Sequence, residues 1–235
     1  MSISIFAIGD LHLSGAKDKP MDVFGVHWQN HWEKIRKNWE EQVASDQDII
    51  LLPGDISWAM KLADAEIDLD SIGSLPGRKI MIKGNHDYWW SSLSKVRSLL
   101  PPSVHVLQND SLSMSGFTFC GTRGWNNPGM KDFTQQDAKV YNREVQRLEL
   151  SLESAVKDEG DHSSNLIVML HYPPFDDKGQ PTEMVHILSR YKPAHVVYGH
   201  LHDEGTRYAF EGIYEETEYH LVSCDYLDFR LKKII

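Results

Sequence analysis

Five short, mainly apolar runs recur along the chain, and each is closely followed by glycine, aspartate or histidine. They occupy residues 3–8, 48–52, 79–82, 166–170 and 195–198. An apolar run of about four to eight residues bounded by turn-forming residues is typical of a strand buried on both faces. We therefore predict five buried strands, each ending in a polar loop.

Between these runs, apolar residues recur at helical spacing, which predicts helices over 28–43, 62–72, 91–99 and 137–156. In the first helix the buried stripe would be Trp28, Trp32, Ile35 and Trp39. In the last helix it would be Val140, Val145, Leu148, Leu152 and Val156. Residues 134–137, Thr-Gln-Gln-Asp, resemble a capping box at the start of that last helix.

Strands that alternate with helices favour an α/β fold with parallel strand pairing. Further short strands, expected to pair antiparallel, are predicted at 104–107, 112–114, 117–120 and within 206–231. The sheets should therefore be mixed. The sequence contains no internal repeat or linker-like stretch, so we predict a single domain over residues 1–235.

The charge balance narrows the possible partners. The 235 residues include 24 Lys and Arg against 34 Asp and Glu, a net charge of −10 with neutral histidines. An acidic surface repels phosphate backbones and anionic lipid headgroups, so we expect neither an extended nucleic-acid surface nor a membrane partner. One pocket can still be cationic, because bound metal ions do not enter this sum.

Cysteine usage and the first residues of the chain favour the cytoplasm. Cys120 and Cys224 are too few for a disulfide framework and form no zinc-type pair. The first ten residues lack a basic leader and a cleavage site, and no apolar stretch is long enough for a bilayer span. We therefore expect a soluble cytoplasmic protein.

The residues that follow the five apolar runs are the candidate chemistry. All of them offer oxygen or nitrogen donors: Asp10, His12, Asp55, Asn85, His86, Asp87, His171, His200 and His202. In open α/β sheets ligands bind beyond the carboxyl ends of the strands, so we expect these side chains to converge. Imidazole and carboxylate donors suit divalent first-row metals, and the lack of cysteine argues against a thiolate zinc site.

Seven donors remain once His86 is set aside as a non-ligand and Asp87 is assigned to orienting His86 or capping the next helix. Seven exceeds what one tetrahedral ion with an open position can use. Two ions that share one bridging carboxylate would use them all. Such a pair activates water and stabilises both the attacking and the leaving oxygen in phosphoryl transfer.

The spacing of these donors resembles a known family. Asp10-x-His12, Gly54-Asp55, Gly84-Asn85-His86-Asp87, His171 and Gly199-His200-x-His202 are similar to the five-block signature of the calcineurin-like metallophosphoesterases. The resemblance spans residues 10–202, and it implies a four-layer αββα sandwich of two mixed sheets flanked by helices.

The same resemblance implies roles for the residues. One metal would be held by Asp10, His12, Asp55 and His202, and the other by Asp55, Asn85, His171 and His200. A hydroxide between the metals would attack phosphorus in line, with His86 as general acid or as a stabiliser of transition-state charge. The metals would be manganese or iron, with zinc, nickel or magnesium as alternatives. The substrate would be a small phosphorylated molecule, a monoester or a diester.

Two branches of the family are disfavoured. The protein serine/threonine phosphatases resemble GDxxDRG at the second block, where this chain reads Gly-Asp-Ile-Ser-Trp-Ala over 54–59. The purple acid phosphatases place a metal-bound Tyr three residues after the bridging Asp, where this chain has Trp58. The Gly-Asn-His-Asp block looks more like that of the small bacterial phosphohydrolases and phosphodiesterases.

Several other residues have two possible roles. Arg123, in a Gly-flanked loop, is either a bidentate clamp on substrate phosphate or a surface arginine in a turn. Three tryptophans follow the second and third blocks closely: Trp58, Trp89 and Trp90. Each could stack on an organic leaving group or pack in the core, and we expect core packing for at least one of them. A structural role is expected for the seven histidines outside the motifs: His27, His31, His105, His162, His186, His195 and His220.

Two other functions compete with a phosphoesterase. A metal-dependent amidohydrolase also uses Asp and His-x-His ligands, but usually places His-x-His after its first strand, where this chain has Asp10-x-His12. A non-catalytic metal-binding scaffold is disfavoured by the presence of His86. The sequence gives no indication of the oligomeric state.

Overall fold

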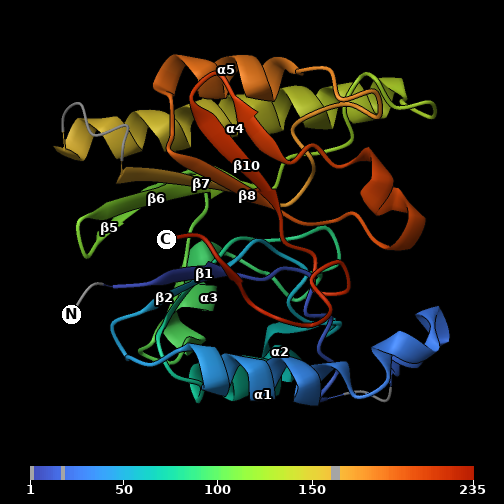
Figure 1. Cartoon of the computed structure of the whole chain (residues 1–235), viewed down its shortest axis with the longest axis vertical. Coiled ribbons are helices and arrows are strands. Elements are labelled where there is room, and N and C mark those ends of the chain that lie inside the picture. Colours follow the sequence, from blue (N-terminus) through green and yellow to red (C-terminus); the bar gives the residue numbers. More distant parts are fainter. Residues whose placement is uncertain (1–2, 17–18, 160–164) are drawn as a thin grey trace. The chain divides into compact units, whose positions relative to one another are not determined.

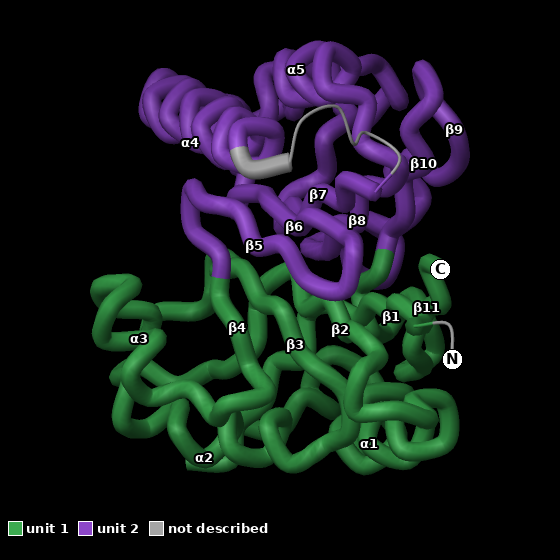
Figure 2. Tube along the Cα trace, turned by 90° about the vertical axis from the view of Figure 1, so that its left-hand side faces the viewer, with its two compact units in different colours: residues 1–106, 222–235 green, residues 107–221 purple. Residues whose placement is uncertain are grey.

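The computed structural model describes residues 3–16, 19–159 and 165–235. His162 lies outside these ranges. The chain divides into two compact units, the first made of residues 1–106 and 222–235 and the second of residues 107–221 (Figure 2).

The sheet of the first unit has the strand order β11-β1-β2-β3-β4. Its strands are β1 (Ile5–Ala7), β2 (Ile49–Leu52), β3 (Arg78–Met81), β4 (Val104–Val106) and β11 (Lys232–Lys233). The first four are parallel to their neighbours, and β11 pairs antiparallel with β1. Consequently the loops that follow β1, β2 and β3 leave the sheet at the same edge.

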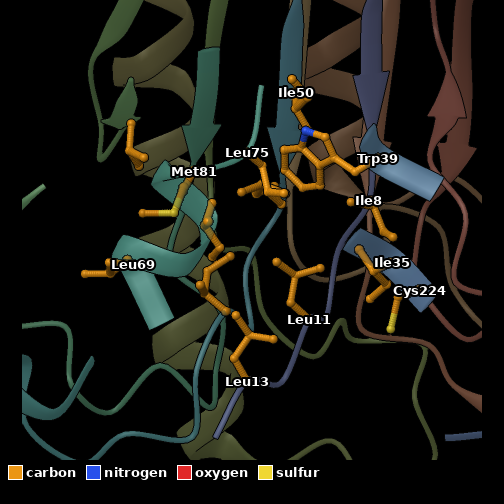
Figure 3. Close-up of a cluster of buried hydrophobic side chains, with 14 of the residues drawn as sticks. Ile8, Leu11, Leu13, Ile35, Trp39, Ile50, Leu69, Leu75, Met81 and Cys224 are labelled. Atoms are coloured by element: carbon orange, nitrogen blue, oxygen red, sulfur yellow. The ribbon is translucent and has the colours of Figure 1, made fainter. Parts of the chain in front are cut away.

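Three helices cover one face of this sheet: α1 (His31–Gln42), α2 (Leu62–Gly73) and α3 (Leu93–Leu99). Two 3-10 turns, Met21–Phe24 and Val26–Trp28, precede α1. Ile50 of β2 packs in one core cluster with Ile35 and Trp39 of α1 and Leu69 of α2 (Figure 3). The Trp39 indole also donates a hydrogen bond to the Pro76 carbonyl at 2.9 Å, so this buried ring retains a polar partner.

The second unit contains a sheet of order β5-β6-β7-β8-β10-β9. The strands are β5 (Ser111–Met114), β6 (Phe117–Thr122), β7 (Leu166–Leu170), β8 (His195–Tyr198), β9 (Gly212–Tyr214) and β10 (Thr217–Leu221). The central pairs are parallel, and the hairpins β5–β6 and β9–β10 are antiparallel. Both sheets are therefore mixed, as the sequence predicts.

Helices α4 (Gln135–Glu159) and α5 (Glu183–Tyr191) cover one face of this second sheet (Figure 1). The predicted capping box is confirmed, because Asp137 N–H donates to Thr134 Oγ1 at 3.1 Å and Thr134 N–H donates to Asp137 Oδ2 at 3.0 Å. None of the helices in the described ranges combines the length and the hydrophobicity that a membrane span requires.

The fold class is confirmed, and so are the four predicted helices, with shifted ends. Three details of the prediction were wrong. Residues 104–106 pair parallel with β3, because α3 forms a crossover between the two strands. In the 206–231 region, which opens with part of the 3-10 turn Asp203–Tyr208, β10 pairs antiparallel with β9 but parallel with β8. Helix α5 was missed, since its short apolar run of residues resembles a buried strand as much as a helix.

The stripe of α4 also differs at its end from the prediction. Leu148 and Leu152 are fully buried, but Ala155 continues the stripe, and Val156 is 39% exposed. At about 100° per residue, a position seven residues after Leu148 lies roughly 20° from it around the helix, and one eight residues after lies roughly 80° away. The buried stripe therefore passes through Ala155.

Replacing Leu152 by Ala is expected to lower the free energy of unfolding by about 2–4 kcal/mol, because the side chain is fully buried and its loss leaves a cavity. The matched control is Leu150→Ala, in the same helix with the side chain 55% exposed, for which we expect a change within about 0.5 kcal/mol. Urea denaturation of both variants measures the difference. Equal losses would contradict the packing of α4 described here.

Candidate metal centre

In the first unit, the loops after β1 and β2 run side by side beyond the sheet. Asp10 N–H donates to the Gly54 carbonyl at 3.0 Å, and His12 N–H donates to the Asp55 carbonyl at 2.9 Å. Leu13 N–H continues the pairing to Ile56 at 2.9 Å. The predicted donors Asp10, His12 and Asp55 are thus brought together by backbone hydrogen bonds.

Two further side chains hold the carbonyls of the first loop. Cys224 Sγ lies 3.0 Å from the Asp10 carbonyl as a thiol donor, and burial raises the pKa of this thiol well above its usual value. His31 Nε2 lies 3.0 Å from the Leu11 carbonyl, and burial lowers the pKa of this imidazole. His31, expected to be structural, thus braces the loop that carries Asp10 and His12.

The backbone itself is strained at the predicted donors. Asp10, His12 and Asp55 have φ values of 58°, 47° and 53°, in the left-handed region. This conformation costs roughly 1–2 kcal/mol for a residue with a Cβ and is concentrated at functional sites. The pairing of the two loops maintains this conformation and thereby fixes the directions of the three side chains.

Asp87 joins the loops after β2 and β3. Its carboxylate is fully buried and accepts five hydrogen bonds. The donors are the backbone N–H groups of Asp55, Ile56, Ser57 and Gly84 and the indole N–H of Trp89, at 2.8–3.2 Å. Burial raises the pKa of Asp87, and these hydrogen bonds act against that shift. Its main role is therefore to anchor both loops.

Gly84 allows the closest approach of these two loops. A Cβ added there would lie 2.1 Å from Asp55 Oδ1 and 2.2 Å from Asp55 N. Any side chain at position 84 would therefore displace Asp55, the donor that the family resemblance makes a bridging ligand.

The two oxygens of Asp55 face different neighbours. Oδ1 accepts the backbone N–H of His86 at 2.8 Å, and Oδ2 lies 3.8 Å from His12 Nε2. Ligand atoms that share one ion at about 2.0–2.2 Å lie roughly 3–4 Å apart. The His12–Asp55 separation therefore fits two ligands of one metal, and Asp55 itself is only 2% exposed.

Trp58 packs against two of the predicted site residues, His12 and His86. Its ring stacks on His12 with centroids 4.8 Å apart and planes at 19°, and it lies 4.6 Å from the His86 ring. Its indole N–H contacts Met21 Sδ at 3.1 Å. Trp89 and Trp90 are buried in the core cluster, which confirms the expectation of core packing for at least one of the three tryptophans.

In the second unit, His171 follows β7 and is fully buried. Its backbone N–H donates to the Arg123 carbonyl at 3.0 Å, and its carbonyl accepts Gly199 N–H at 3.2 Å. The His171 and His200 rings lie 5.1 Å apart at 70°, and Tyr172 packs on the His200 ring at 3.9 Å. The unit thus brings together the two histidines that the resemblance assigns to one metal.

His200 and His202 follow β8. His200 has φ 73°, the same left-handed conformation as the donors of the first unit. His202 occupies the N-cap position of the Asp203–Tyr208 turn, where its carbonyl accepts Gly205 N–H at 2.8 Å. Both residues therefore sit in ordered backbone at the carboxyl end of a sheet strand.

The guanidinium of Arg123 is engaged within its own unit. Arg123 Nη2 lies 3.4 Å from Glu144 Oε1, and the guanidinium stacks over Trp125 at 4.5 Å. Glu144 is buried and also accepts Arg147 Nη1 at 2.6 Å. These contacts hold the Arg123 side chain in place, and 21% of it is exposed. A substrate role for Arg123 stays a prediction.

Sequence reasoning missed three supports of the site. Asp87 was noted, but not the number of its donors, which depends on how two separate loops meet. Asp68 of α2 accepts Ser57 Oγ at 2.5 Å and Gly15 N–H at 2.9 Å, and burial raises its pKa. Tyr172 packs against His200. The sequence points to Tyr172 only through its position directly after His171.

The comparison with known protein families agrees with the donor pattern. A sequence model described as calcineurin-like phosphoesterase matches residues 3–204. The chain belongs to this family. The family description makes it a metallophosphoesterase, a metal-binding hydrolase of phosphoester bonds, and the clustered His and Asp donors fit that chemistry.

Solved structures show the same fold at low sequence identity. TT1561 of Thermus thermophilus is 14% identical with a TM-score of 0.57, covering 99% of this chain and 98% of that chain. AQ665 of Aquifex aeolicus, a protein of unknown function, is 14% identical with a TM-score of 0.52, covering 99% and 96%. No curated protein matched the chain.

Substituting Asp87 by Asn is expected to lower the free energy of unfolding by about 2–4 kcal/mol. Oδ1 and Oδ2 accept three and two N–H groups, so either orientation of the amide points its NH₂ group at N–H donors. Urea denaturation of the metal-stripped protein measures this loss. Asp70→Asn, an exposed carboxylate in α2, is the matched control. A loss no larger than that of the control would contradict the anchoring role.

Proposed function

We propose that the protein is a dimetal-dependent phosphohydrolase that cleaves a phosphomonoester or phosphodiester. The observation that best supports it is the environment of Asp55, a buried carboxylate in strained backbone with one oxygen on His86 N–H and the other near His12 Nε2. Burying ionisable groups in strained backbone costs free energy of folding and adds nothing to the packing of the apolar core. Such an arrangement is typical of an active site.

The ligand set of the proposal follows the family resemblance residue by residue. Asp10, His12, Asp55 and His202 hold one ion, and Asp55, Asn85, His171 and His200 hold the other. The separations within each unit fit this assignment, with 3.8 Å from His12 Nε2 to Asp55 Oδ2 and 5.1 Å between the His171 and His200 rings. Manganese or iron is the proposed metal, because imidazole, carboxylate and amide donors suit both.

Two bound divalent ions supply an activated water and electrostatic stabilisation of the attacking and leaving oxygens. The residues of the chain prepare for this chemistry. Asp87 fixes the loops, Trp58 fixes the rings of His12 and His86, and His86 is positioned by its backbone hydrogen bond to Asp55. His86 then delivers a proton to the leaving oxygen.

The proposed substrate is a small phosphorylated molecule. The net charge of −10 makes the surface as a whole repel a polyanion. A phosphate group must therefore be attracted locally, by the positive charge of the metal centre. Arg123 is the proposed additional contact to a phosphate oxygen. A cytoplasmic location belongs to the same proposal, and it is supported by the two buried cysteines, neither of which forms a disulfide.

The first experiment measures turnover of an aryl phosphate monoester and the corresponding diester by metal-stripped protein resupplied with manganese. Asp55→Asn keeps the size of the side chain and its tolerance for positive φ, but removes the bridging charge. We expect kcat/KM to fall by more than about a hundredfold, because loss of a direct ligand should exceed the effect of losing an outer-shell partner. Asp70→Asn is the matched control.

The proposal fails if Asp55→Asn retains the wild-type kcat/KM. Turnover of amides or lactones in place of phosphoesters would support the amidohydrolase alternative. Stoichiometric metal binding without turnover of any ester would support the scaffold.

His86→Asn tests the proton donor separately from the metal ligands. For an alkyl phosphate with a poor leaving group we expect kcat to fall by about 10²–10⁴-fold, whereas a nitrophenyl ester should be little affected because its leaving group needs no proton. Metal content should stay unchanged, since His86 is not a proposed ligand. A uniform loss across all leaving groups would show that His86 stabilises charge and is not the acid.

A further inference from the structure

Three side chains with metal-binding potential lie together in the second unit, apart from the strand-end donors. His195 is the first residue of β8, and Glu218 and His220 lie on β10. The parallel register pairs Glu218 with His195 and His220 with Val197. All three side chains are therefore on one face of the sheet, while Val196 and Tyr219 face the opposite side, in the core beneath α4 and α5.

The ligand atoms of these residues are spaced as a metal ion requires. His195 Nδ1 lies 3.1 Å from His220 Nε2 and 3.5 Å from Glu218 Oε2, and His220 Nε2 lies 3.8 Å from the same oxygen. Tetrahedral ligands at about 2.0–2.1 Å from zinc are roughly 3.3–3.4 Å apart. One ion can therefore contact all three atoms with only small side-chain movements.

The electrostatic setting favours a cation at this point. Two imidazole nitrogens lie 3.1 Å apart, a distance that suits either an N–H···N hydrogen bond between the rings or a metal ion that both nitrogens contact. His195 and His220 can each offer a neutral ring nitrogen as a metal ligand. The Glu218 carboxylate supplies negative charge on the third side.

We propose that His195, Glu218 and His220 form a zinc site separate from the dimetal centre. Two histidines and one glutamate are a set that zinc uses in proteins, and three protein ligands leave a fourth position for water. The Glu218 side chain is 45% exposed, which gives an ion access from solvent. His195, Glu218 and His220 are not among the seven proposed ligands of the dimetal centre, so the two sites share no ligand.

The bound ion would have a structural consequence. It would cross-link β8 to β10, in addition to the hydrogen bonds of their parallel pairing. This proposal does not depend on the phosphohydrolase function, because none of its three ligands belongs to that site.

The test counts zinc ions per chain by elemental analysis after dialysis of the full-length protein at a fixed free zinc concentration. We expect His195→Gln and His220→Gln each to bind one zinc ion fewer than the wild type. His186→Gln, which changes an exposed histidine of α5 in the same unit, should bind as many as the wild type. Manganese-dependent phosphoesterase activity, measured in parallel, should be unchanged in all three variants.

A second pair of measurements separates this site from the dimetal centre. In an Asp55→Asn background, which weakens the strand-end ligands, His220→Gln should still remove one zinc ion. Glu218→Gln changes a partly exposed side chain and leaves both histidines in place. This variant therefore tests the site if the histidine variants fail to fold. We expect it to weaken the affinity of this zinc by roughly 10–100-fold or more. Folded His195→Gln or Glu218→Gln protein with wild-type zinc content and affinity would overturn the proposal.

Discussion

The buried carboxylate of Asp87 is the interaction on which the strand-end loops of the first unit depend. Parallel strands bring successive loops to one edge of a sheet, but nothing in a strand dictates how those loops continue. Asp87 supplies that order, because its two oxygens accept hydrogen bonds from backbone N–H groups of the loops after β2 and β3. One charged group thus replaces the hydrogen bonds that secondary structure would otherwise provide.

Much of the architecture follows from local patterns in the sequence. The apolar runs at 49–52 and 166–170 are buried on both faces and pair parallel with both neighbouring strands, as continuous runs of Ile, Val and Leu indicate. The capping box follows from two residues three positions apart, Thr134 and Asp137. The pairing between distant segments, such as β4 with β3, could not be predicted. Nor could the short helix α5, because its nine residues contain too few turns to distinguish helical spacing from a buried strand.

Part of the candidate site can likewise be predicted from the sequence, and part of it cannot. Donor identities are visible in the sequence because each block follows a recognisable strand, and the family model that matches residues 3–204 confirms the family. The supports of the site are not visible, since the hydrogen bonds of Asp87 to Asp55 and of Asp68 to Ser57, and the stacking of Trp58 on His12, join residues 11–46 positions apart. The grouping of His195, Glu218 and His220 likewise depends on the register of β8 and β10, which no local motif specifies.

The left-handed backbone at Asp10, His12, Asp55 and His200 restricts which residue types these positions can accept. Outside glycine, that conformation is most accessible to Asn, Asp and His, and least accessible to β-branched residues. Asp and His are also common ligands of divalent metals. Apart from glycine, the residue types that this conformation favours therefore carry side-chain oxygen or nitrogen atoms, so the backbone of these loops and the chemistry of a metal ligand select the same few residue types.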